Sequence, residues 1–401
     1  MPLDTKRAID LAESDILELI SNGTEEGREI DYKELLKIGS DGERKEFLAD
    51  ISSFANASGG HLIFGVAETD GRPTAIKPLT ITNWDAERLR IESLVRDGIS
   101  PRLAMEPTAV AVPSGHVIVL RIPRSWSGPH MVRFQHSGRF YSRNSGGKYQ
   151  LDVGEIRTAF TSGAQVADAI RTFRQTRLSA IVSGEAPVRL LEGPKIILHC
   201  CPYTSTALGA SVDIRKAQQQ PALVRPMFDF GHSPGYNLDG VMAYSPERAM
   251  SGFGQSYFQL FRDGKVECVD SQLLRPKEGR GRVMPSIAVP GICIASLSRI
   301  FKLFRVLDVE PPAAVMLTFL GVESYTMALD PMLGYGSSEI DRDALIIAAE
   351  IADSYEPATA ATIMRPIFDT LWNATGLSHC SAYDAAGEPC KELRNYIQRM
   401  G

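Results

Sequence analysis

The sequence predicts an α+β fold, and three observations support that prediction. Residues 9–21 carry apolar side chains at helical spacing. Residues 61–68, HLIFGVAE, form a nearly continuous apolar run that is typical of a strand in the middle of a sheet. Asp263–Gly264 separates two strand-like runs, as the turn of a β-hairpin does. Helices and paired strands are therefore expected along the whole chain.

The first domain is expected to cover residues 1–165 and to hold at least three helices. Its elements follow in order: a helix over 9–21, a strand over 29–36, a helix over 42–60 that stops at Gly59–Gly60, a strand over 61–68, a helix over 86–99, a hairpin over 104–125, and over 139–160 a strand, a glycine-rich loop and a closing helix.

Residues 166–194 are predicted to form a helix and a linker, and residues 195–401 a second α/β domain whose topology the sequence leaves open. Its expected elements are a strand over 195–203, a hairpin over 256–271, a helix over 292–306, strands over 313–322 and 344–351, and a helix over 358–376 interrupted by Pro366. The pattern assigns no role to this domain.

Composition excludes several classes of protein. The 401 residues are 44% hydrophobic and 23% charged, as in a soluble globular protein of about two domains. The net charge of −5 means that any nucleic-acid contact must come from a local patch. Six cysteines without a CxxC pair argue against a zinc site and a disulfide scaffold. The acidic N-terminus and the charges within residues 286–304 argue against a signal peptide and a membrane span. We therefore expect a cytoplasmic protein.

Three acids near the N-terminus are candidate metal ligands. Asp31 lies on the strand over 29–36, Glu26 precedes it, and Glu68 ends the strand over 61–68. If these strands pair, the acids can meet at one edge, and clustered carboxylates suit Mg²⁺ or Mn²⁺. Lys33 shares a strand face with Asp31 and could hold a phosphate oxygen. The alternative is a solvated strand on which Lys33 simply pairs with Asp31.

A basic segment follows with no acid in it. Aromatic residues are interleaved with its cations, as a nucleic-acid backbone surface requires. The alternative is a strand with exposed arginines and core aromatics. The candidate nucleic-acid-binding residues are Arg121, Arg124, Arg133, Arg139, Arg143 and Lys148.

Three stretches together resemble the Schlafen AlbA_2 domain over roughly residues 12–162: EEGREIDYK, FANASGGHLIFGVAETDG and GRFYSRNSGGKYQLDVGEI. The resemblance implies a mixed sheet with helices and a three-carboxylate, divalent-metal site that cleaves RNA; prokaryotic relatives are linked to phage defence. Position by position, it implies that Glu26, Asp31 and Glu68 are the metal ligands and catalytic acids, with Lys33 beside them. Asp31 stands where the family has Glu, and Glu68 where it has Asp.

Two functions follow as expectations. The first is a metal-dependent endoribonuclease that acts on structured RNA, tRNA above all, with Mg²⁺ or Mn²⁺ as cofactor. A homodimer or the C-terminal domain would complete its groove. The second is a non-catalytic nucleic-acid-binding module, resembling a transcriptional regulator, with a sensing C-terminal domain. In that case the three carboxylates point apart or pair with Arg28 and Lys33.

Overall fold

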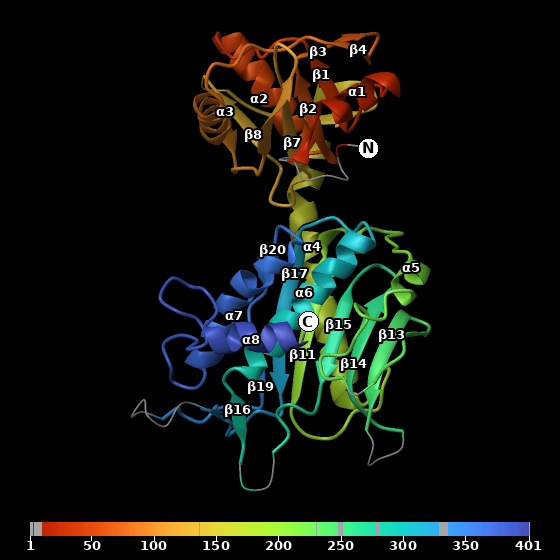
Figure 1. Ribbon diagram of the computed structural model, residues 1–401, viewed down its shortest axis with the longest axis vertical. Coiled ribbons are helices and arrows are strands. Elements are labelled where there is room, and N and C mark those ends of the chain that lie inside the picture. Colours follow the sequence, from red (N-terminus) through yellow and green to blue (C-terminus); the bar gives the residue numbers. More distant parts are fainter. Residues whose placement is uncertain are drawn as a thin grey trace. The chain divides into compact units, whose positions relative to one another are not determined.

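The chain forms two compact units, Met1–Gln165 and Val166–Gly401. Its structure is a computed structural model that describes Leu3 and residues 10–135, 137–229, 231–247, 252–276, 279, 281–328 and 336–400. Figure 1 labels the elements of each unit, and both units combine helices with sheets, which confirms the α+β class. In the part of the chain described, no helix has both the length and the apolar content to cross a membrane.

The first unit is built around a four-stranded sheet in the order β1-β2-β7-β6. Strand β2 lies inside this sheet, as its apolar run predicted. Strand β1 runs parallel to β2, whereas β2, β7 and β6 pair antiparallel. The strands are β1 (Ile30–Lys33), β2 (Gly59–Phe64), β6 (Glu106–Val112) and β7 (Gly115–Pro123).

Helices cover both faces of that sheet because side chains alternate along its strands. Leu62 and Phe64 of β2 join one core with α2 (Asp41–Ala55) and α3 (Trp84–Gly98). Ile63 points to the other face and joins a core with α1 (Glu13–Ser21). Helix α2 begins with a capping box, in which Ser40 accepts from the Glu43 backbone and the Glu43 carboxylate accepts from the Ser40 N–H.

A second four-stranded sheet, in the order β10-β9-β8-β5, also packs against α2. Its strands are β5 (Ile99–Ser100), β8 (Met131–Phe134), β9 (Ser137–Asn144) and β10 (Gly147–Gln150). The glycine-rich loop expected within residues 139–160 is a tight turn that leads into a strand before the closing helix: Asn144 pairs with Gly147, and the chain turns directly into β10. Gly147 adopts φ 105°, which favours glycine in so tight a turn.

The strand predicted over 61–68 is interrupted at Gly65. Gly65 has φ 94°, and a Cβ atom there would lie 3.2 Å from the Lys77 carbonyl oxygen. The chain therefore leaves β2 and forms β3 (Val66–Thr69), which pairs with β4 (Arg72–Ile76) in a separate hairpin. Glu68 consequently lies on this hairpin and not at the end of β2.

The second unit contains an antiparallel sheet of eight strands in the order β12-β13-β14-β15-β11-β17-β19, with β20 also paired to β17. The predicted hairpin over 256–271 is present as β14 and β15, and the strand predicted over 344–351 is split into β19 and β20. The strands are β11 (Lys195–Pro202), β12 (Gly235–Tyr236), β13 (Gly240–Pro246), β14 (Gly254–Phe261), β15 (Val266–Asp270), β17 (Ala313–Leu320), β19 (Ala344–Ile346) and β20 (Glu350–Ala352).

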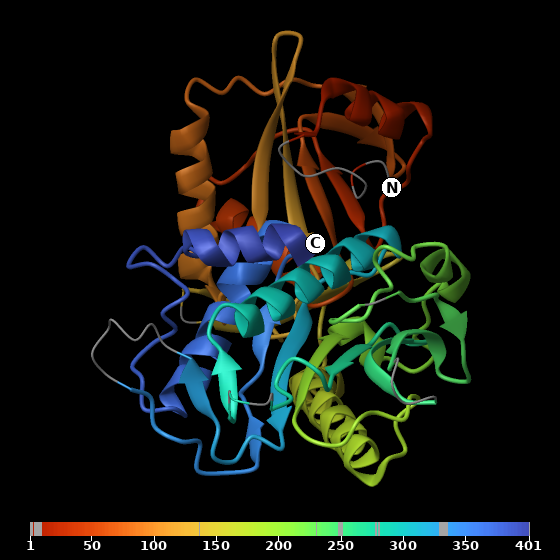
Figure 2. The ribbon, with the colours of Figure 1, turned by 60° about the horizontal axis from the view of Figure 1, so that its bottom comes forward.

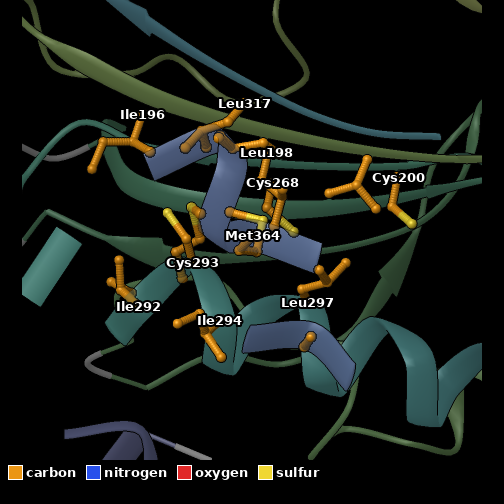
Figure 3. Close-up of a cluster of buried hydrophobic side chains, with 14 of the residues drawn as sticks. Ile196, Leu198, Cys200, Cys268, Ile292, Cys293, Ile294, Leu297, Leu317 and Met364 are labelled. Carbon is orange, nitrogen blue, oxygen red and sulfur yellow. The ribbon is translucent and has the colours of Figure 1, made fainter. Parts of the chain in front are cut away.

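Helices also cover both faces of this sheet. Even-numbered residues of β11, such as Leu198, face a large core with α6 (Ala288–Val306) and α7 (Ala360–Asn373). Figure 2 shows α6 beside α8 (Lys391–Met400), and Figure 3 shows part of the core beneath them. Ile197 faces the opposite side, where Leu178 and Ile181 of α4 (Val153–Ser183) pack. All six cysteines are free, as their spacing predicted.

Candidate functional site

Asp31 lies at the centre of a group of charged side chains in the first unit. Its neighbours Ile30 and Tyr32 face the core shared with α1, so Asp31 points to the other face of β1. Only 5% of Asp31 is exposed. Its Oδ1 atom lies 2.6 Å from Lys33 Nζ, and its Oδ2 atom lies 2.7 Å from Arg143 Nη2. The pairing of Asp31 with Lys33, given above as the alternative to a metal site, is confirmed, but Asp31 is buried, and at Asp31 the strand face is not solvated as that alternative expected.

These two cations keep the Asp31 carboxylate ionised. Burial alone favours the neutral acid, but Lys33 and Arg143 outweigh it and lower the pKa of Asp31 below its usual value. Lys33 has 40% of its side chain exposed. Burial lowers the pKa of Lys33, yet the nearby carboxylates, led by Asp31, raise it overall. Lys33 is therefore a charged group through which the cluster meets solvent.

Arg143 is buried on the other side of Asp31 and contacts several groups there. Its side chain is only 2% exposed, and its guanidinium carbon lies 4.0 Å from the centre of the Phe54 ring. Its Nε donates to the Gly27 carbonyl oxygen at 3.2 Å. Its Nη1 is buried and has no acceptor within the described residues. Arg143 was predicted to bind nucleic acid, but these internal contacts indicate a structural role.

Glu26 lies close to Asp31, but one of its carboxylate oxygens accepts a hydrogen bond from the backbone. Glu26 Oε1 accepts from the Tyr32 N–H at 2.8 Å. Burial, together with repulsion from the Asp31 carboxylate, raises the pKa of Glu26 despite that bond. Two of the three predicted acids are therefore brought together, as their positions on and before β1 suggested.

Glu68 is exposed and closes a turn. Its Oε2 atom accepts from the Gly71 N–H at 2.8 Å, while the Gly71 carbonyl oxygen accepts from the Glu26 N–H at 2.7 Å. The turn that carries Glu68 is thus joined to the segment that carries Glu26. Its carboxylate, however, is engaged by its own hairpin.

Two acids that the sequence analysis did not select belong to the same group. Asp50 of α2 is 6% exposed and lies 2.7 Å from Lys148 Nζ through Oδ1, and Glu46 lies 2.6 Å from the same nitrogen. Burial raises the pKa of Asp50, although Lys148 opposes the shift. A carboxylate between Phe47 and Ile51 on the buried side of a predicted helix was the available signal.

The predicted metal ligands do not form a ready site in this arrangement. Among the residues whose structure is described, no group of three His, Cys, Asp or Glu side chains is placed to hold a metal ion. The physical reason is that Lys33, Arg143 and two backbone N–H groups already occupy oxygens of these acids. The assignment of Mg²⁺ or Mn²⁺ stays a prediction.

The predicted basic residues divide into three groups by exposure. Arg143 and Lys148 are largely buried and neutralise Asp31 and Asp50. Arg121 is half-buried, with its Nε 3.3 Å from His61 Nε2. The exposed cations are Arg124, Arg133 and Arg139.

The three exposed cations differ in their contacts. Arg124 stacks over the Trp126 ring at 4.0 Å from its centre, and Arg139 donates to Gln150. In the described ranges, the Arg133 side chain makes no hydrogen bond, ion pair or ring contact.

The comparison with protein families agrees with the resemblance seen in the sequence. Residues 26–152 match the family described as Schlafen, AlbA_2, and this range includes all four predicted catalytic positions.

The solution structure of the N-terminal domain of a putative ATP-dependent DNA helicase RecG-related protein from Nitrosomonas europaea is 21% identical, with a TM-score of 0.27, over 37% of this chain and 94% of that one. The DIP2311 protein from Corynebacterium diphtheriae is 17% identical, with a TM-score of 0.25, over 34% of this chain and 26% of that one. No curated protein matches the chain. The segment 26–152 is a Schlafen AlbA_2 domain.

Proposed function

We propose that the first unit is a nucleic-acid-binding module that contacts phosphates and needs no metal ion to bind. The Schlafen AlbA_2 match supports a nucleic-acid-related role. The positions of the carboxylates support binding without a metal, because Asp31 is bound by cations and Glu68 by its own turn.

The distribution of charge carries this proposal. Residues 107–151 contain no Asp or Glu. Three cations of this segment meet carboxylates from other parts of the chain: Arg143 and Lys148 pair with the buried Asp31 and Asp50, and Arg121 lies 4.0 Å from Glu106. The exposed Arg133 therefore keeps its charge available for an external anion. Phosphate contacts of this kind dominate affinity for nucleic acids even when the protein as a whole is acidic.

The test is binding of a fluorescent oligonucleotide to the full chain over a range of salt concentrations without divalent metal. We expect affinity to fall steeply with salt. Arg133→Gln should lower the slope of log K against log salt by about 0.7–0.9, the value for one phosphate contact. The matched control is Arg88→Gln, an exposed arginine of α3 paired with Glu92. Salt-independent binding, or equal effects of the two variants, would contradict the proposal.

A second candidate function is the metal-dependent endoribonuclease, with structured RNA, tRNA above all, as substrate and a role in phage defence. The observation that favours it is the approach of Glu26 to Asp31, with the Glu68 turn joined to the Glu26 segment through Gly71. A metal would have to displace Lys33 or Arg143 from Asp31. A hard dication would then stabilise charge on the phosphodiester. A homodimer would supply the second half of a groove.

Incubation of the protein with total tRNA and Mn²⁺, with and without EDTA, tests this candidate. We expect Asp31→Asn to abolish any EDTA-sensitive cleavage. Asp15→Asn is the control, because Asp15 is another buried acid of the same unit and caps α1. Absence of cleavage by the unsubstituted protein, or cleavage by Asp31→Asn at the unsubstituted rate, would remove this candidate.

A further inference from the structure

An exposed aromatic side chain lies on the first unit, outside the acid cluster. Phe160 of α4 is 57% exposed. Its ring packs edge-on against Phe140 of β9, with 5.7 Å between ring centres and an interplanar angle of 78°. Phe140, which belongs to the sheet, thus supports one side of the Phe160 ring, while much of Phe160 remains exposed to water. A single exposed ring is ordinary, but a ring that packs against a second aromatic side chain at the surface can form part of a larger contact surface.

Arginines flank this pair on two sides. Arg157 lies one helical turn before Phe160 on α4 and is exposed. On the sheet, Met131 is opposite Phe140, and Arg133 follows two residues later on the same face of β8. Gly138 is opposite Arg133, and a Cβ atom there would lie 2.6 Å from the Met131 sulfur. Because glycine has no side chain, Gly138 leaves room for the Met131 side chain next to Arg133.

A third aromatic residue lies next to the following turn of α4. The Trp126 carbonyl oxygen would be 3.2 Å from a Cβ atom at Gly163, so the Trp126 segment runs against the helix just after Phe160. The Arg124 guanidinium stacks over the Trp126 ring, 4.0 Å from its centre. We call Arg124, Trp126, Arg133, Phe140, Arg157 and Phe160 the aromatic surface.

We propose that the aromatic surface binds single-stranded nucleic acid, with a base stacked on Phe160 and phosphates held by the flanking arginines. The inference rests on the proposed binding function and specifies its ligand. A duplex keeps its bases stacked inside and presents few base faces to a protein. A single strand offers free base faces and a flexible backbone, which suit aromatic rings interleaved with cations.

The chemistry of the surface also favours this ligand over a protein partner. Three arginines surround the rings, and the segment 107–151, which supplies four of the six residues, has no carboxylate. Such an excess of cations attracts a polyanion. The nearest acid in sequence to Phe160 is Glu155, and its carboxylate oxygens are already engaged: they accept from the Tyr149 hydroxyl at 3.0 Å and from the Asp152 N–H at 2.9 Å.

The experiment compares a twelve-nucleotide oligouridylate with an RNA duplex of the same length, both bound to the full chain. We expect Phe160→Ala to weaken single-strand binding by about 5- to 100-fold, as for loss of one stacked base, and to change duplex binding little. Phe160→Tyr should restore binding because it retains the ring. Leu89→Ala, which removes another exposed apolar side chain (62% exposed) from α3, is the control.

The outcomes separate this inference from the proposed function. If the unsubstituted protein binds neither RNA, both fail. If it binds RNA but Phe160→Ala binds the single strand as tightly as Leu89→Ala does, the function stands and the aromatic surface is not the site. Selective loss with Phe160→Ala and recovery with Phe160→Tyr support the inference, with thermal unfolding showing that each variant is folded.

Discussion

Asp31 in the first unit and Glu267 in the second are buried carboxylates that bind cations, yet their surroundings differ. Glu267 of β15 is 0% exposed and accepts from Arg177, His199 and the Tyr257 hydroxyl at 2.7–3.0 Å. Asp31 binds Arg143, which is buried, and Lys33, which is 40% exposed.

The difference lies in how far each cluster of charges is open to solvent. Every partner of Glu267 is at least 85% buried, so the network is sealed under α4 and stabilises the second unit. The Asp31 cluster opens to water at Lys33 and keeps an unused buried donor, Arg143 Nη1. Sealed networks fix structure, whereas a cluster that reaches solvent can exchange partners with a ligand.

The largest effect should come from breaking the sealed network. Arg177→Met leaves Glu267 buried without its bidentate partner, so we expect a loss of about 3–5 kcal/mol in the free energy of unfolding. Urea unfolding of the full chain measures it. Arg171→Met is the control on the same helix, because Arg171 and its partner Asp168 are both exposed, and its loss should be below about 1 kcal/mol. Equal losses for the two variants would contradict the comparison.

Asp270, on the same strand as Glu267, shows the opposite behaviour. Burial raises the pKa of Asp270 to about 7, and its Oδ2 atom has no partner in the described structure. Because the folded state favours the protonated acid, the stability that the Asp270 shift contributes is complete below pH about 4 and is lost as pH rises to about 7. Asp270→Asn should therefore stabilise the protein by roughly 2–4 kcal/mol at pH 8 and much less at pH 4. Thermal unfolding at both pH values checks the sign.

Lowering the pH should reduce stability through Glu267, which is the opposite of its effect through Asp270. Burial opposes its charge, but His199 and Arg177 lower the pKa of Glu267 to about 2. The stability that this shift confers is complete above pH about 4.5, the range of the unfolded chain, and is lost as pH falls towards 2. The loss should be roughly 3 kcal/mol. Glu267→Gln should flatten this part of the stability curve; an unchanged acid limb would show that Glu267 is not responsible.

Disrupting the Asp31 cluster should lower the free energy of unfolding by less than disrupting the Glu267 network does. Arg143→Met removes one partner of Asp31 and the stacking on Phe54, but Lys33 remains and water can enter beside it. We expect a loss of roughly 2 kcal/mol in the free energy of unfolding, from a lost hydrogen bond to a charged group. A loss as large as that of Arg177→Met would show that the Asp31 cluster is sealed too.

The smallest effect on stability should come from Lys33→Met. The Lys33 side chain is 40% exposed, so its attraction to Asp31 is screened by solvent, and the loss should stay below about 1 kcal/mol. If Lys33 contacts phosphate, Lys33→Met should lower the binding free energy for an oligonucleotide by more than it lowers the free energy of unfolding. A variant that binds normally but unfolds easily would assign Lys33 a structural role.

The sequence by itself determined the local elements and the relations along single strands. Period-two alternation places Lys33 beside Asp31, and Asp263–Gly264 forms the predicted hairpin turn, because both depend on neighbouring residues only. The three family stretches also identified the Schlafen AlbA_2 domain that the comparison confirms.

Only the tertiary structure decided what neutralises the acids. Arg143 reaches Asp31 from 112 residues away, and Lys148 of β10 reaches Asp50 of α2. Gly65 turned Glu68 away from the end of β2, a change that a continuous apolar run did not reveal. Side-chain periodicity fixes which face a residue occupies, but the partner on that face depends on how distant segments pack, and that packing is a property of the whole unit.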